Sequence, residues 1–197
     1  KAEQFLRTLR VYKVQRTTDG RHADFAPAVD VNSNPKNPII GVRSYGSDPA
    51  LVARLGAAQV RGYAAGGVLA VAKHFPGHGD TAVDSHIGLP LVDRPRASVD
   101  AVELPPFKAA IAAGVPMLMP AHVIAPALGA VDVPVTFSGA ALSLLRGELG
   151  YQGVIVSDSL DMGAVAKSTP VPEAAVLSFL AGCDLLLTGK TDYRSAH

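Results

Sequence analysis

The sequence predicts an α/β fold with parallel strands, of the TIM-like (β/α)8-barrel type. Apolar runs alternate with longer helical windows, and this order is typical of βα units with a parallel sheet. The runs are nearly continuous, as expected of strands that are covered on both faces. Four of them end near ionisable residues: Asp30, Lys73 with His74, His122 and Asp158. In a barrel these ends form one rim, whereas a doubly wound sheet gathers them mainly at a switch point.

Length and composition narrow the possibilities. The 197 residues suffice for one domain with a sizeable core, so we expect residues 1–197 to form a single domain. A whole barrel takes about 250 residues, and we therefore expect an incomplete barrel that lacks its first strands. A net charge of +1 gives no electrostatic support for nucleic-acid or membrane-surface binding. No apolar run approaches the roughly 18 residues of a membrane span.

Five strands are predicted from short apolar runs bounded by glycine, proline or asparagine. They cover residues 23–31, 67–74, 115–122, 153–158 and 183–188. The last run contains Cys183, the only cysteine, which excludes an internal disulfide and any multi-cysteine metal site. Its apolar neighbours indicate an unreactive thiol in the core. Between the first two strands, residues 32–45 read as a loop that presents Arg43.

Helical windows separate these strands. Apolar spacing and end signals predict helices over residues 1–14, 47–65, 99–113, 139–149 and 172–181. Candidate N-caps are Ser47, Ser98 and Ser138, and a glycine follows each of these three windows. The Pro105–Pro106 pair inside the third window allows that helix to begin near Pro105 instead. Asp19–Gly20 is a turn signal.

One stretch concentrates the ionisable side chains. It runs from Ala70 to Pro90 with the sequence AVAKHFPGHGDTAVDSHIGLP, and an apolar strand in it leads into a glycine-rich loop. The ionisable residues of this loop are His78, Asp80, Asp84 and His86. Such a loop contributes little to stability, and functional residues are commonly placed on loops held by a rigid scaffold.

Asp84 and His86 stand two residues apart, so in an extended loop their side chains point to the same side. The carboxylate can then hold the imidazole in one tautomer and raise its basicity; the alternative is a solvated loop pair. Asp158 follows the apolar run Val154–Val156. A carboxylate at that strand end can serve as nucleophile, base or metal ligand, and the alternative is a helix N-cap.

The remaining polar residues indicate substrate binding more than metal binding. Arg43, Lys73 and His74 read as donors for hydroxyl, carbonyl or anionic groups of a substrate. His74 and His78 are possible metal ligands, but the proline and glycine between them exclude a helical HxxxH pair, and the Lys73 ammonium would repel a cation. No metal is therefore expected. For His122 we favour a pocket wall or a buried histidine over a ligand.

At this point the motifs are recognisable. KHFPGHGDTAVDSH (73–86) resembles the signature of glycoside hydrolase family 3, in its β-N-acetylglucosaminidase branch. Four further segments resemble that family in the same order: DFAPAVDVNSNPKNPIIGVRSYGSDP (24–49), MLMPAHV (117–123), LLRGELGYQGVIVSDSLDMGAV (144–165) and AGCDLLL (181–187). The resemblance covers nearly the whole chain from Asp24 onward, and a match over several segments is highly specific.

The resemblance implies a TIM-like barrel and a retaining, two-step mechanism that needs no metal or organic cofactor. By its motifs, Asp158 matches the nucleophile, His86 the general acid/base and Asp84 the partner of that histidine. The residues that match those holding the terminal N-acetylglucosamine are Arg43, Lys73 and His74. Asp30 and His122 are expected to line the pocket. Ser159 departs from the typical family pattern, which has a second acid there, and no equivalent of an early sugar-binding acid is found before Asp24.

The expected function is an exo-acting β-N-acetylhexosaminidase that removes terminal β-linked N-acetylglucosamine from glycans or muropeptides derived from cell wall or chitin. Three alternatives stay open. One is a β-N-acetylglucosaminide phosphorylase with an anion site near His86. The second is a catalytically silent sugar-binding remnant. The third is a metal-dependent barrel hydrolase using His74, His78, His122 and Asp158. The sequence leaves open the aglycone, the oligomeric state and the compartment, either cytoplasmic or exported to the cell wall.

Overall fold

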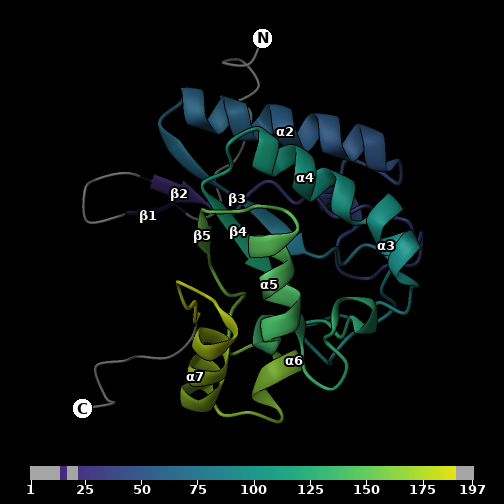
Figure 1. Ribbon diagram of the computed structural model, residues 1–197, viewed down its shortest axis with the longest axis vertical. Coiled ribbons are helices and arrows are strands. Elements are labelled where there is room, and N and C mark those ends of the chain that lie inside the picture. The colour runs from purple at the N-terminus through teal and green to yellow at the C-terminus, as the bar shows by residue number, and fades with distance from the viewer. Residues whose placement is uncertain (1–13, 17–21, 190–197) are drawn as a thin grey trace.

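The computed structural model describes residues 14–16 and 22–189, and a five-stranded sheet runs through its centre (Figure 1). Strand order follows chain order, from β1 to β5. The strands are β1 (Val14–Arg16), β2 (His22–Asp24), β3 (Val68–Phe75), β4 (Met117–Pro120) and β5 (Val154–Ile155). Pairing is parallel from β2 through β5, while β1 is antiparallel to β2. The predicted parallel α/β order is therefore confirmed for the described strands.

Helices separate the parallel strands β2 to β5 along the chain. The α-helices are α2 (Pro49–Ala65), α3 (Arg96–Val102), α4 (Leu104–Ala112), α5 (Gly139–Gly147), α6 (Gly163–Ala166) and α7 (Val171–Ala181). Three 3-10 turns are η1 (Gly41–Arg43), η2 (Pro126–Leu128) and η3 (Val135–Phe137). Figure 1 shows α2 and α4 lying side by side along β3, with α5, α6 and α7 grouped further along the chain.

The first predicted strand is shorter in the structure but keeps its direction. Pro27 has no N–H group and interrupts the regular strand, yet the ladder to β3 continues beyond it. Lys73 N–H donates to the Pro27 carbonyl (3.0 Å), and Val29 N–H donates to the Lys73 carbonyl (2.7 Å). As a result, the residues up to Asp30 run beside β3. The predicted strand 183–188 is reduced to a parallel bridge between Val156 and Leu185.

Tight packing fixes the helices against the strands. A Cβ at Gly56 of α2 would lie 2.7 Å from the Val29 side chain, so glycine permits the close approach of helix and strand. Phe75 of β3 and Phe107 of α4 are fully buried and meet edge to face, with ring centroids 5.4 Å apart. The expected core thiol, Cys183, is buried, and burial raises its pKa to about 12.

Two predicted helix starts are corrected. Asp48, not Ser47, caps α2, and its Oδ1 accepts the Ala50 N–H at 2.9 Å. Ser98 lies inside α3 rather than at its cap, because the window predicted over residues 99–113 divides into α3 and α4 just before the Pro105–Pro106 pair. Proline is tolerated only in the first turn of a helix, which explains the division.

Other helix predictions are confirmed or fall on residues that are not described. Ser138 caps α5 by accepting the Ala141 N–H at 3.2 Å. The window over residues 172–181 corresponds to α7. Of the helix predicted over residues 1–14, only Val14 is described, and it belongs to β1; the Asp19–Gly20 turn lies outside the described residues.

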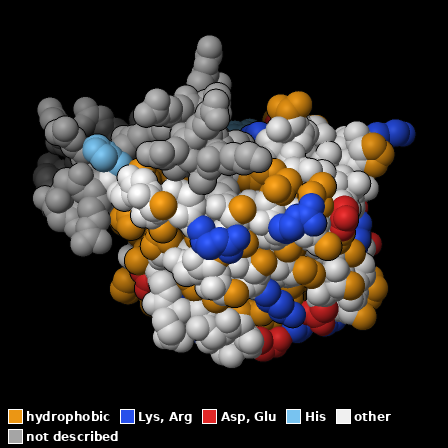
Figure 2. Space-filling model, turned by 90° about the horizontal axis from the view of Figure 1, so that it is seen from above, with side chains coloured by type: hydrophobic (Ala, Val, Ile, Leu, Met, Phe, Trp, Pro, Cys, Tyr) orange, Lys and Arg blue, Asp and Glu red, His pale blue; other side chains and the backbone are white. Residues whose placement is uncertain are grey.

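The face that carries α2 shows basic side chains spread singly among apolar and neutral ones (Figure 2). This distribution agrees with the near-zero net charge and offers no concentrated basic surface on that face. None of the helices in the described part of the chain combines the length and the hydropathy that crossing a membrane requires.

Candidate active site

The carboxyl ends of the central strands surround a pocket of about 130 Å³. Its lining residues are Ile39, Arg43, Lys73, His74, His78, Ser85, His86, Asp158 and Met162. Five of the six predicted site residues are thus gathered on one pocket although they come from separate parts of the chain. The sixth, Asp84, contacts His86 at its edge. Parallel strands ending on the same side explain this convergence.

Asp30 lies beneath the pocket and is fully buried. Its Oδ2 lies 2.9 Å from His74 Nδ1, and its Oδ1 accepts the His78 N–H at 2.7 Å. Burial alone would raise the pKa of Asp30, but attraction and hydrogen bonding from His74 and His78 together hold the pKa below its ordinary value. Asp30 was expected to line the pocket; instead it supports the two histidines that do.

Asp158 follows the short strand β5 and its side chain lines the pocket. Its Oδ1 accepts the N–H of Ser159 at 2.7 Å. Burial opposes ionisation, but His74, His122, the Ser159 N–H and Lys73 outweigh it and lower the pKa of Asp158. An ionised carboxylate surrounded by donors and positive groups is suited to attack an electron-poor carbon. The N-cap alternative is not observed, since α6 begins at Gly163 with no side-chain cap.

Asp84 and His86 form the predicted pair, but in a turn rather than in the expected extended loop, because the Asp84 carbonyl accepts the N–H groups of Ile87 and Gly88. His86 Nδ1 lies 2.8 Å from Asp84 Oδ1, and the same oxygen accepts the His86 N–H at 2.8 Å. The His86 side chain is 59% exposed and that of Asp84 is 25% exposed. Burial would raise the pKa of Asp84, and the two hydrogen bonds from His86 lower it. The Nε2 of His86 is thus left for proton exchange while Nδ1 faces the carboxylate.

Lys73 and Arg43 bring positive charge to the lining of the pocket. Burial lowers the pKa of Lys73 and Arg43 lowers it further, while Asp158, Asp30 and Asp24 act in the opposite sense. The Arg43 side chain is exposed and donates to the Ile39 carbonyl at 2.7 Å. Both residues can donate hydrogen bonds to hydroxyl or carbonyl oxygens of a bound molecule.

The rings of His78 and His122 contact buried hydroxyl and carbonyl groups next to the pocket. The ring of His78 contacts Thr81 Oγ1 (2.6 Å) and Ser85 Oγ (3.0 Å). His122 is fully buried and its ring contacts Thr136 Oγ1 and the Ser159 carbonyl. His122 therefore is a buried histidine beside the nucleophile candidate rather than a lining residue.

The described residues contain no group of three or more histidine, cysteine or acidic side chains arranged to hold a metal ion. In the set considered for a metal-dependent hydrolase, His74 faces Asp30, and His78 and His122 face hydroxyl and carbonyl groups. Both ring nitrogens of His78 and of His122 have protein partners, and His74 turns its Nδ1 toward Asp30, so among the described residues these side chains are not arranged as a ligand set. Asp80, another candidate from the loop, forms a two-fold ion pair with Arg94 at 2.7 Å.

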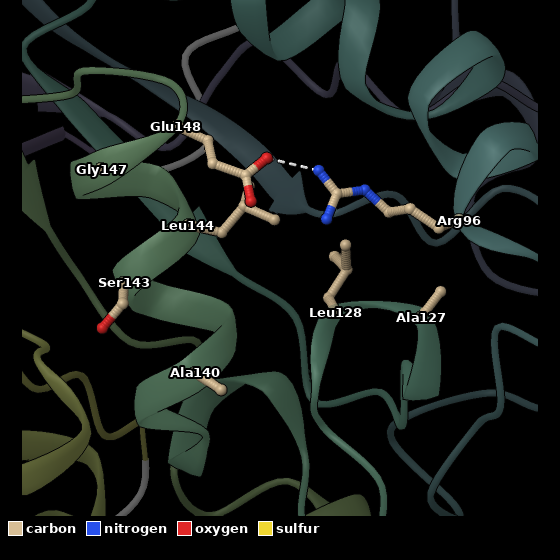
Figure 3. A pocket seen from close by; sticks show the side chains of 8 residues that line it. All are labelled: Arg96, Ala127, Leu128, Ala140, Ser143, Leu144, Gly147 and Glu148. Carbon is tan, nitrogen blue, oxygen red and sulfur yellow. Dashed lines mark hydrogen bonds and ion pairs between the residues drawn. The ribbon is translucent and has the colours of Figure 1, made fainter.

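A larger hollow, of about 310 Å³, lies between α3, η2 and α5 (Figure 3). Its charged side chains, Arg96 and Glu148, are paired with each other across it. Leu128, Leu144 and small residues supply the rest of the lining. Compensated charge and an aliphatic wall offer no acid–base or nucleophilic chemistry, so the smaller pocket is the candidate active site.

The family model described as the glycosyl hydrolase family 3 N terminal domain matches residues 10–196. The chain belongs to glycosyl hydrolase family 3. Beta-hexosaminidase A of Pseudoalteromonas piscicida is 47% identical over 180 residues, which are 85% of this chain and 30% of that relative. A solved family 3 beta-N-acetylglucosaminidase from Paenibacillus sp. is 53% identical with a TM-score of 0.83, over 84% of this chain and 32% of the other.

A further solved family 3 relative, the beta-glucoside phosphorylase BglX, is 30% identical with a TM-score of 0.80. The match covers 86% of this chain and 32% of that one. The chain thus spans about a third of the length of these three relatives. The predicted α/β barrel class of glycosyl hydrolase family 3 and its β-hexosaminidase branch are confirmed by these matches.

Sequence reasoning missed several residues that shape this family 3 pocket. Asn37 donates from Nδ2 to the carbonyls of His78 and Thr81, both at 2.8 Å, and so fastens the loop to the chain before α2. Ser85 lies between the two members of the dyad but points inward to His78. The asparagines of residues 32–37 and the serine inside DSH were the available signals, and neither residue type indicates such a partner by itself.

Proposed function

We propose that the pocket performs retaining hydrolysis of a terminal β-linked N-acetylglucosamine. The observation that carries this proposal is the presence of two different groups on one small pocket: the ionised Asp158 carboxylate and the Asp84–His86 pair. Relatives named beta-hexosaminidase and beta-N-acetylglucosaminidase support the substrate class. We also infer that residues 1–197 form one domain, since the family model spans residues 10–196.

In the first step, Asp158 Oδ attacks the anomeric carbon while the bond from that carbon to the leaving oxygen breaks. His86 gives its proton to the leaving oxygen, so the aglycone departs neutral. The product is a glycosyl ester of Asp158. Arg43, Lys73 and His74 hold the sugar hydroxyls and the acetamido group during this step.

In the second step, His86 takes a proton from water, and the water oxygen attacks the anomeric carbon. The ester bond to Asp158 breaks, the carboxylate is regenerated and N-acetylglucosamine leaves with its β configuration retained. Asp84 stabilises the imidazolium that forms and holds the ring orientation. Histidine takes the place of the carboxylic acid that usually serves as acid/base in glycosidases. The natural substrates we infer are glycans or muropeptides derived from cell wall or chitin.

A phosphorylase is the second candidate, favoured by the positive groups on the lining and by the relative named as a phosphorylase. Phosphate would then replace water as the acceptor and N-acetylglucosamine 1-phosphate would be the product. The aglycone and the first step would be unchanged, so the two candidates differ only in the second step.

The test is release of 4-nitrophenol from 4-nitrophenyl N-acetyl-β-glucosaminide, with and without inorganic phosphate, followed by chromatography of the sugar product. We expect phosphate-independent release of free N-acetylglucosamine, abolished by Asp158→Ala and retained by Asp132→Ala, which changes an exposed carboxylate outside the pocket. Turnover that requires phosphate would assign the phosphorylase. Binding of N-acetylglucosamine without turnover would identify a silent sugar-binding protein and contradict the proposal.

A further inference from the structure

Ser85 is the one buried residue of the short dyad segment. Its relative exposure is 2%, whereas the side chains of its neighbours Asp84 and His86 are 25% and 59% exposed. Ser85 is thus turned inward between a partly exposed aspartate and an exposed histidine. The position of the acid/base pair therefore depends on what Ser85 contacts.

The side chain of Ser85 contacts His78. Ser85 Oγ lies 3.0 Å from His78 Nε2, and His78 Nδ1 lies 2.6 Å from Thr81 Oγ1. The Thr81 hydroxyl donates to the His78 carbonyl at 3.0 Å, so its oxygen accepts the proton of His78 Nδ1. His78 Nε2 is then an acceptor, and Ser85 donates to it. Burial lowers the pKa of His78 to about 4, which keeps this neutral form at ordinary pH.

His78 is itself fixed to the floor of the pocket. Its backbone N–H donates to Asp30, which also faces His74, and its carbonyl accepts from Asn37. Ser85 thus connects the exposed dyad to the same buried carboxylate that orients His74. Asp30 therefore supports two parts of the site: His74, which holds the sugar, and, through Ser85, the histidine that donates the proton.

Residues that follow Asp158 in the chain hold the backbone around Ser85. The Ser85 carbonyl accepts the Ala164 N–H at 3.0 Å, and Lys167 Nζ donates to the Ile87 carbonyl. A Cβ at Gly163 would lie 2.4 Å from the His86 carbonyl oxygen, so only glycine permits this contact. Gly163–Ala166 is helix α6, the first helix after Asp158 along the chain.

We propose that Ser85, with His78 and the glycine start of α6 at Gly163, positions the Asp84–His86 pair over Asp158. This inference rests on the proposed function. Ser85 and Gly163 are positioning residues, because they act through the loop and carry out no step of the reaction. The chain segment that follows the nucleophile therefore also holds the acid/base pair in place.

Two variants with matched controls test the proposal. Ser85→Ala removes the donor to His78, and Gly163→Ala forces His86 away. Ser143→Ala changes an exposed serine of α5, and Gly147→Ala changes a helical glycine whose added Cβ meets nothing within 4 Å. Amide hydrogen exchange of the folded chain is measured first, because it needs no turnover. In both test variants we expect about tenfold faster exchange at Ile87, Gly88 and Ala164, and no change in the controls.

Turnover gives the second readout. In the test variants we expect kcat on 4-nitrophenyl N-acetyl-β-glucosaminide to fall about 10²-fold. A 2,4-dinitrophenyl leaving group needs no proton, and azide attacks the glycosyl ester of Asp158 without losing one. The 2,4-dinitrophenyl glycoside together with azide should therefore restore most of the turnover rate of the test variants and give the glycosyl azide as product. A merely structural defect would not respond to azide.

The outcomes separate this inference from the proposed function. Faster exchange around the dyad in Ser85→Ala and Gly163→Ala supports the positioning role even if the chain hydrolyses no glycoside. Exchange at these amides equal to that of the parent would overturn it, whatever the turnover. Rate loss without azide rescue would overturn it as well, since the defect would then lie outside the acid/base.

Discussion

His74 Nδ1 lies 2.9 Å from Asp30 Oδ2, and both residues stand at ends of neighbouring parallel segments of the sheet. Asp30 is fully buried and also accepts backbone N–H groups of His74 and His78. One carboxylate thus orients a lining histidine and the start of the loop that carries the dyad. Stability and site geometry are coupled at this residue.

Asp30→Asn should therefore destabilise the protein strongly. Removing one partner of a buried, hydrogen-bonded pair costs about 3 kcal/mol or more in the free energy of unfolding. Asp132→Asn, at an exposed position, should change it by less than about 0.5 kcal/mol. Urea unfolding followed by circular dichroism measures both. Equal stabilities for the two variants would show that Asp30 is not the support described here.

Asp84→Ala should lower kcat by about 10²-fold, the lower end of a general acid–base contribution. The reason is that His86 Nδ1 loses the carboxylate that lies 2.8 Å away and orients the ring. The loss in kcat/KM, which reports the first step, should shrink for leaving groups that depart without a proton. Steady-state kinetics on nitrophenyl and dinitrophenyl glycosides test this, with Asp132→Ala as the control. A loss in kcat/KM of the same size on both substrates would contradict the role of the pair.

Glu103 predicts a distinct pH dependence of stability. Its side chain is 2% exposed beneath Gly77, and burial, opposed by Arg94, raises its pKa from 4.5 to about 7. The folded state therefore binds a proton more tightly than the unfolded state, and the contribution of Glu103 to stability falls as the pH rises from about 4.5 to 7. The whole effect is at most roughly 3 kcal/mol.

The measurement compares parent and Glu103→Gln by thermal unfolding at pH 5 and pH 8. Several carboxyl groups titrate in the parent, so the difference between the two proteins isolates Glu103. The variant should gain stability relative to the parent at pH 8 and gain little at pH 5. A difference that does not change with pH would refute the raised pKa.

The sequence predicted the order of the parallel strands and the Asp84–His86 pair, for identifiable reasons. Asp84 and His86 are two residues apart in the sequence, so their spacing keeps the two side chains within reach of each other. The strand ends were visible because Lys73, His74 and Asp158 directly follow apolar runs. Their convergence on one pocket follows from parallel strands, which share a rim.

Features that depend on distant contacts were not predictable. The supporting role of Asp30 depends on its contact with the chain after β3, where it accepts the His78 N–H. The inward orientation of Ser85 depends on its contact with the His78 ring. The cis peptide between Lys73 and His74 has no signal in the sequence. Helix α6 was missed because its four residues, GAVA, are too few to show a period.

The most direct test of the account is covalent trapping of the nucleophile. The chain is incubated with a 5-fluoro-N-acetylglucosaminyl fluoride, whose ester with the enzyme hydrolyses slowly, and is then digested and analysed by mass spectrometry. We expect one 5-fluoro-N-acetylglucosaminyl group on the peptide that contains Asp158, and none in Asp158→Asn. A label on any other residue, or no label on the parent chain, would contradict the assignment of Asp158.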